Sequence, residues 1–296
     1  MLKKLFGAAA GALLALLSGA ALAQPVQKDA DPALWVVKDA DTTIYLFGTV
    51  HVLKPGLSWF DEVVKAAFDK SDEVALELIE PDAAAMQALL FKTAVASGGP
   101  SLTEKLPADK RAAFAKELAD LGLPPAGLDR YEPWFAAMTL SVAPLQKLGW
   151  DPNGGAERTI TNAAKAAKKP LIGLETAEQQ LGYFDTLPEA LQIKFLTSVI
   201  DDYAETGPKL DKMVALWAAG DSDALGRELN AEMRKTPEIG NVLLAQRNAR
   251  WAEWIEKRMA KPGTVFLAVG AGHLAGKDSV QAQLARHGIR AVRIRY

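Results

Sequence analysis

The chain contains no cysteine among its 296 residues, and only three histidines, His51, His273 and His287. Without cysteine there is no disulfide bond, no thiolate nucleophile and no metal site built on sulfur. Any metal would have to be bound by nitrogen and oxygen ligands. Because histidine is so scarce, the position of each one carries information.

A long apolar run is also missing after the first 23 residues. These begin with Lys3 and Lys4, continue through the apolar stretch 8–17 and end on Ala21-Leu22-Ala23. That order is typical of a secretory signal peptide, and its apolar part is too short to span a bilayer. We therefore expect residues 1–23 to be removed. The mature chain, 24–296, should be periplasmic or secreted and have no membrane span.

Positive charge is not in excess. The chain has 34 lysines and arginines against 36 acidic residues, a formal net charge of −2, and it becomes more acidic once Lys3 and Lys4 are removed. This balance argues against non-specific binding to nucleic acid or to an anionic membrane. We expect no nucleic-acid partner, and the sequence leaves the oligomeric state open.

Four short apolar runs end on a histidine or a glutamate. Residues 43–51 end on His51 and 264–273 on His273, whereas 74–77 end on Glu77 and 170–175 on Glu175. Such runs are typical of buried strands. In a mostly parallel sheet, ligands bind at the carboxyl ends of the strands. If the four runs lie in one sheet, the four side chains converge on one site.

The rest of the pattern predicts how this sheet is completed. Residues 34–37 and 42–47 predict a hairpin, and a helix from Ser58, with Asp61 as an approximate capping box, leads to the strand ending at Glu77. Beyond 81 the spacing is almost entirely helical until 262, with one strand at 170–174. The helical segments are 83–96, 107–121, 132–148, 156–168, 188–200, 210–219, 222–235 and 237–257. A helix at 279–287 and a strand at 289–294 close the chain.

We therefore predict an α/β fold, with a central, mostly parallel sheet built from the N- and C-terminal parts of the chain. A large helical insert spans about 81–262, and residues 24–296 form a single domain. His287 is expected at the surface.

Two histidines and one or two glutamates are natural ligands for a divalent transition metal such as Mn, Co or Zn. They leave a position for water, whose pKa the metal lowers, and a spare carboxylate can act as general base. Each histidine follows a glycine in a Gly-x-x-His motif, Gly48 to His51 and Gly270 to His273. We expect each glycine to allow a sharp turn where the strand ends.

Other catalytic motifs are absent or weak. The sequence has neither His-Glu-x-x-His nor Gly-x-Ser-x-Gly. Residues 270–275 satisfy a loose dinucleotide fingerprint, but no acidic residue follows the next strand to bind a ribose. Two alternatives to a metal enzyme stay open: a metal-free, esterase-like hydrolase with His51 as general base, and a protein that binds haem or another ligand without turnover.

Taken together, the motifs resemble the TraB/GumN family, which includes the Tiki proteins, membrane-tethered metal-dependent proteases. The matching segments are 46–51, 76–78, 173–176 followed by Gln179 and Gln180, 246–248 and 269–274. The resemblance implies a metal-dependent, metallopeptidase-like hydrolase acting on a peptide or small-molecule substrate. It implies metal-site or catalytic roles for His51, His273 and Glu77, with Glu175 as an accessory carboxylate.

Arg247 and Asn248 lie in the predicted helix 237–257. A guanidinium there can bind a substrate carbonyl or carboxylate, or stabilise a developing oxyanion. The resemblance favours this role over that of a solvated surface pair, so both residues are expected to orient the substrate.

Overall fold

The computed structural model describes residues 27–151, 154–233 and 236–295. The predicted signal peptide, 1–23, lies outside the described residues. Within the described part, no helix is both long and apolar enough to cross a membrane.

A six-stranded sheet forms the centre of the molecule, with the strand order β6-β5-β7-β3-β2-β8. Its strands are β2 (Leu34–Lys38), β3 (Thr42–Thr49), β5 (Glu73–Leu78), β6 (Leu171–Glu175), β7 (Gly263–Gly270) and β8 (Val292–Ile294). Strands β6, β5, β7 and β3 are parallel to one another, and β2 is antiparallel to both β3 and β8. The predicted α/β fold with a mostly parallel sheet is confirmed.

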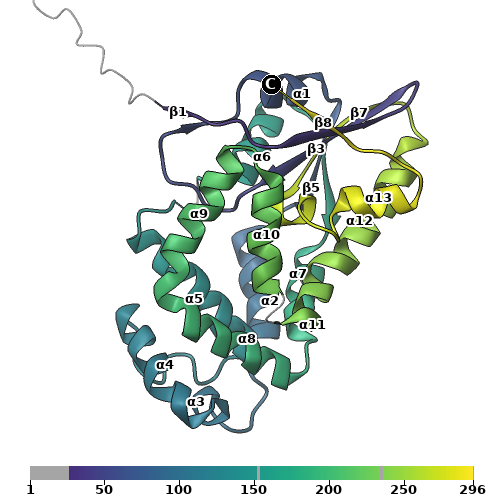
Figure 1. Cartoon of the computed structure of the whole chain (residues 1–296). Helices are drawn as coiled ribbons and strands as arrows, with labels where there is room; N and C mark the ends of the chain where they lie inside the picture. The colour runs from purple at the N-terminus through teal and green to yellow at the C-terminus, as the bar shows by residue number, and fades with distance from the viewer. Residues whose placement is uncertain (1–26, 152–153, 234–235, 296) are drawn as a thin grey trace, which may run out of the picture.

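The two ends of the chain meet in the middle of this sheet. Strand β3 pairs with β7 from Thr42 opposite Gly263 to Thr49 opposite Gly270. In Figure 1 the purple N-terminal strands therefore lie beside the yellow-green strand β7. Both Gly-x-x-His segments leave the sheet at the same edge, as neighbours.

Side chains alternate across the sheet, and both faces are buried. On one face Ile44 and Leu46 pack with Val265 and Leu267 against α12 and α13. On the other, Phe47 packs with α1 and α6. A sheet covered on both faces needs apolar residues at every position, which explains the continuous apolar runs in the sequence.

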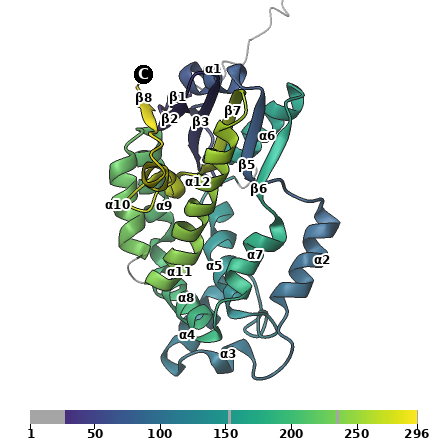
Figure 2. The same cartoon turned by 90° about the vertical axis from the view of Figure 1, so that its right-hand side faces the viewer.

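Most of the helices between β5 and β7 extend beyond the carboxyl edge of the sheet, with α3 and α4 farthest from it, whereas α6 and α12 cover its two faces (Figures 1 and 2). The helices beyond the edge pack in part around a separate apolar cluster that includes Phe114 and Leu196. The helices of the chain are α1 (Glu62–Lys70), α2 (Ala83–Ala94), α3 (Leu102–Lys105), α4 (Ala108–Asp120), α5 (Pro133–Lys147), α6 (Ala156–Ala166), α7 (Ala177–Asp185), α8 (Glu189–Asp202), α9 (Thr206–Ala218), α10 (Ser222–Met233), α11 (Pro237–Gly240), α12 (Gln246–Met259) and α13 (Val280–Arg286).

Helix α1 and the helix predicted over 237–257 differ from the prediction, and α3 and α7 were not predicted. Helix α1 begins at Glu62, later than the predicted start, because Ser58 belongs to the short strand β4 (Leu57–Ser58) and its hydroxyl donates to the Asp61 carboxylate. The helix predicted over 237–257 is interrupted by a π-helical turn, η2 (Asn241–Ala245). Such turns are frequent at functional sites, and this one directly precedes Arg247.

Candidate functional site

The glycines of the two Gly-x-x-His motifs are required by close approach and not by a left-handed backbone, and after Gly270 the chain turns from β7 into the short 3-10 helix η3 (Ala271–Leu274). Neither Gly48 nor Gly270 has a positive φ. A Cβ on Gly48 would lie 3.0 Å from the Cα of Ala271, so this glycine lets the two motifs pack together. A Cβ on Gly270 would lie 3.1 Å from Oε1 of Glu77.

The open position beside Gly270 is where the predicted site residues meet. A Cβ there would also lie 3.6 Å from Cδ2 of His273 and 3.9 Å from Nε2 of His51. The Gly270 N–H donates to Oε1 of Glu77 over 2.6 Å. The structure thus brings His51, Glu77 and His273 around one backbone position.

His273 is buried and its orientation is set by Asn248. The Asn248 side-chain amide donates to the carbonyl of Asp278 over 2.7 Å, so its Oδ1 faces Nδ1 of His273, 2.6 Å away. This network assigns the imidazole proton to Nδ1 and leaves a lone pair on Nε2. Burial lowers the pKa of His273 to about 3, so the ring is neutral at neutral pH. Asn248, 1% exposed, therefore acts on His273 from inside the protein.

Arg247 joins the two glutamates. Its Nη2 donates to Oε2 of Glu77 over 2.6 Å and to Oε2 of Glu175 over 2.7 Å, while its Nε donates to Oε1 of Glu175 over 3.0 Å. Its Nη1 lies 3.2 Å from Nε2 of His273, and its guanidinium lies over the Trp251 ring. Arg247 is thus bound on several sides within the site.

Glu175 is almost fully enclosed, with a side chain only 3% exposed. Besides Arg247, it accepts hydrogen bonds from the Tyr183 hydroxyl over 3.0 Å and the Gln180 amide over 3.1 Å. Both partners lie on α7, which sequence reasoning missed. The capping box of Thr176 and Gln179 starts that helix directly after Glu175. Glu175 thus anchors Arg247 and has both oxygens engaged.

Glu77 keeps its charge despite burial. Burial raises its pKa, but His273, Arg247 and His51 lower it more, to about 2. Because His273 is neutral at neutral pH, the charges that hold Glu77 ionised there are those of Arg247 and His51.

His51 differs from His273 because its ring is 75% exposed and its partner is a carboxylate. Its Nδ1 donates to Oε1 of Glu157 over 2.8 Å, and the Thr49 hydroxyl donates to the same oxygen over 2.5 Å. The hydrogen bond to Glu157 raises the pKa of His51 to about 9. Water screens part of this attraction at so exposed a ring.

Glu157 was not predicted as a site residue. It lies in the first turn of α6, after Gly154 and Gly155, and many helices begin with an acidic residue. The signal in the sequence that could have pointed to Glu157 is the glycine pair before it, because glycine permits close backbone approach. A Cβ on Gly155 would overlap the carbonyl oxygen of His51. That overlap shows how closely α6 approaches the first motif.

The donor atoms fit a metal in kind but do not yet form a coordination sphere. Each imidazole uses Nδ1 for a partner in the protein, as metal-bound histidines do. Nε2 of His51 has no hydrogen-bond partner among the described residues, whereas Nε2 of His273 lies 3.2 Å from Nη1 of Arg247. Nε2 of His273 lies 3.7 Å from Oε1 of Glu77. Within the described residues, however, no group of three or more histidine and acidic side chains is arranged to hold a metal ion as it stands.

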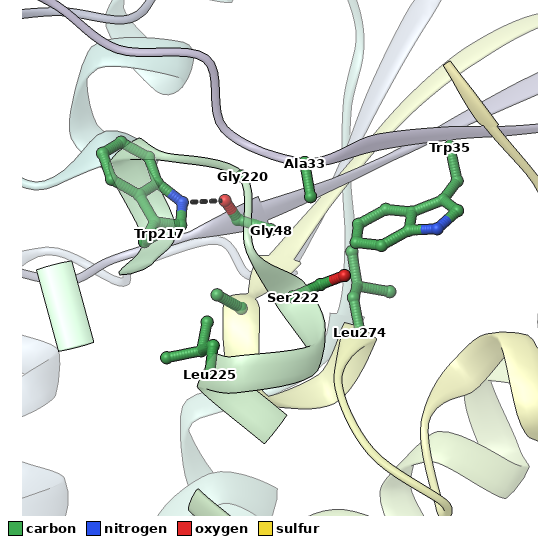
Figure 3. A pocket seen from close by; sticks show the side chains of 9 residues that line it. Ala33, Trp35, Gly48, Trp217, Gly220, Ser222, Leu225 and Leu274 are labelled. Carbon is green, nitrogen blue, oxygen red and sulfur yellow. Dashed lines mark hydrogen bonds between the residues drawn. The ribbon is translucent and has the colours of Figure 1, made fainter. Parts of the chain in front are cut away.

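A small apolar pocket lies behind the two motifs (Figure 3). It is lined by Ala33, Trp35, Gly48, Trp217, Gly220, Ser222, Leu225, Ala271 and Leu274. The Trp217 indole donates to the Gly48 carbonyl over 2.7 Å. None of the residues that line the pocket is acidic or a histidine, so the pocket is separate from the candidate site.

Comparison with known proteins agrees with the motifs. The family model for the TraB/PrgY/gumN family matches residues 33–293. The uncharacterized protein YbaP of Escherichia coli (strain K12) is 27% identical over 165 residues, 56% of this chain and 61% of YbaP. An uncharacterized protein of Treponema pallidum (strain Nichols) is 23% identical over 263 residues, 83% of this chain and 78% of that protein. No solved structure gives a significant match. The matched residues run from β2 to β8 and include every residue of the site, and the chain belongs to the TraB/PrgY/gumN family.

Proposed function

We propose that this chain is a metal-dependent hydrolase of the periplasm that acts on a peptide or small-molecule substrate. The observation that supports this most is the arrangement of the two imidazoles. Both have Nδ1 bound within the protein, and Nε2 of His51 and Cδ2 of His273 both lie near Gly270, where Glu77 also lies. Such an arrangement pre-orients imidazoles for a shared cation.

The chemistry of the donors suits Mn, Co or Zn. His273 is neutral and Glu77 is ionised at neutral pH, so both are ready to bind a cation. His51 would release its proton on binding, as imidazole ligands do. A metal held by these three residues would lower the pKa of bound water and supply hydroxide near neutral pH.

The other residues would orient the substrate and the ligands. Arg247 is a buried cation, so it would stabilise negative charge that develops on a substrate carbonyl or carboxylate, and direct binding would require it to give up one of its present contacts. Asn248 keeps the Nε2 lone pair of His273 directed into the site. Glu175 would act indirectly, by fixing Arg247.

Metal titration of the purified mature chain tests this proposal. Calorimetry with Mn²⁺, Co²⁺ and Zn²⁺ should show one metal per chain, and His51→Gln and His273→Gln should each weaken binding at least tenfold. His287→Gln is the matched control, because His287 is paired with Glu256 outside the site. Cleavage products of a mixed peptide library, read by mass spectrometry, should disappear with a chelator and return with metal. Absence of metal binding in the wild type would reject the proposal.

A metal-free hydrolase is the second candidate, and one contact favours it. Nη1 of Arg247 lies 3.2 Å from Nε2 of His273, where a metal would have to compete with the guanidinium. In this case the His51–Glu157 pair would supply the general base and Arg247 the charge that stabilises the oxyanion. Turnover would then survive strong chelators and be lost in His51→Gln.

A further inference from the structure

We infer that Glu157 is the positioning residue of His51 and that helix α6 aligns the exposed imidazole for the site. This inference rests on the proposed function, and it assigns a role to a residue that none of the motifs contains. Two donors converge on the same oxygen of Glu157, Nδ1 of His51 over 2.8 Å and the Thr49 hydroxyl over 2.5 Å. Among the described residues, His51 has no other hydrogen-bond partner for its ring.

The backbone that carries Glu157 is firmly held against the first motif. The Ala156 N–H donates to the Val50 carbonyl over 2.9 Å, and Gly155 gives the space for the His51 carbonyl. Ala156 and Ile160 on the same helix are fully buried in the core. Helix α6 is therefore fixed in place. The hydrogen bond to Glu157 holds the His51 ring, which would otherwise rotate in solvent.

The two histidines consequently have different supports. His273 is held by the neutral amide of Asn248, whereas His51 is held by a carboxylate. A carboxylate on Nδ1 fixes the ring and makes Nε2 a stronger donor to a cation. His51 needs this support more than His273 does, because no packing encloses its ring.

Isosteric and shortened variants of Glu157 test this role. The quantity to measure is their affinity for Mn²⁺, by calorimetry. Glu157→Gln should weaken Mn²⁺ binding about 10–100-fold, the usual effect of removing a group that supports a metal ligand. Glu157→Asp, which keeps the charge, should restore part of that loss. The free energy of unfolding of the metal-free chain should change much less than the affinity. The matched control is Glu256→Gln, which removes an equal Nδ1 contact of 2.8 Å from His287 at the surface and should leave affinity unchanged.

A second readout separates failure of this inference from failure of the proposed function. In a crystal structure of Glu157→Ala, which removes the acceptor altogether, the His51 ring should be disordered or rotated, whether or not the protein binds metal. Thr49→Val, which removes only the second donor, should reduce Mn²⁺ affinity more weakly and remains informative if Glu157→Gln does not fold. If the His51 ring kept its place in Glu157→Ala, the positioning role would be overturned. Unchanged Mn²⁺ affinity in a metal-binding wild-type background would overturn it as well.

Discussion

At the scale of single residues, the site is a balance of buried charges. Glu77 and Glu175 contribute two negative charges, and Arg247 is the cation that lies between them. Burying charged groups costs free energy that pairing only partly returns. A cluster of this kind is therefore weak as a device for stability, which agrees with a role in binding or chemistry.

Gly270 leaves the open position that the site residues share, so filling it should damage the site directly. In Gly270→Ala, the new methyl group would lie 3.1 Å from Oε1 of Glu77. We expect metal affinity and turnover to fall at least tenfold while the chain still folds. In the control, Gly182→Ala, the methyl group meets nothing within 4 Å, and activity should be unchanged. Equal activities of the two variants, measured with the same peptide mixture, would contradict this.

Glu175 should matter to stability through Arg247. Removing one partner of a buried ion pair costs about 3 kcal/mol or more, and Arg247 keeps Glu77, so Glu175→Gln should lower the free energy of unfolding by about 3 kcal/mol. Glu178→Gln is the control, since Glu178 pairs with Lys92 at the surface over 3.3 Å and exposed pairs contribute little. Urea denaturation of both variants measures the difference, and similar midpoints would argue against the anchoring role of Glu175.

At the scale of helices and strands, the sheet could be predicted and several helical details could not. The runs ending on His51 and His273 became β3 and β7 because strands buried on both faces leave a continuous apolar signal. The π-helical turn before Arg247 has no such signal, since it depends on how α12 packs. Glu157 was missed for a related reason: its partner, His51, is remote in sequence, and an acidic first turn is common.

One of the helices beyond the carboxyl edge of the sheet contains a buried carboxyl group that should make the stability of the fold depend on pH. Glu117 on α4 is 6% exposed, and its Oε2 has no hydrogen-bond partner. Burial raises its pKa from 4.5 to about 7. The positive charge of Lys116 lowers this pKa, whereas the negative charges of Asp120 and Asp201 raise it. The folded state therefore holds this proton more tightly than the unfolded state.

The sign of the resulting pH effect is clear. The stability that comes from protonated Glu117 is fully present below pH 4.5 and is lost as the pH rises through about 7. In Glu117→Gln this part of the decline should vanish, so the urea midpoint should fall less between pH 5 and pH 8 than in the wild type. Parallel pH profiles for the two proteins would show that Glu117 does not titrate as described.

At the scale of the whole molecule, the candidate site exists only when both ends of the chain are in place. His51 follows β3 and His273 follows β7, and the two strands pair along their full length. The segments between them contribute Glu77 and Glu175, which lie on β5 and β6, and Glu157 and Arg247, which lie on α6 and α12. This explains why the family match, 33–293, extends from the first strand of the sheet to the last.

Anomalous diffraction from crystals of the mature chain soaked in Mn²⁺ tests the shared site most directly. Data collected at the manganese absorption edge should give one strong peak, bonded to Nε2 of His51, Nε2 of His273 and the Glu77 carboxylate. The same peak should be absent from crystals of His273→Gln. A peak elsewhere on the molecule, or no peak beside Gly270 at saturating Mn²⁺, would contradict a metal centre built by the two ends of the chain.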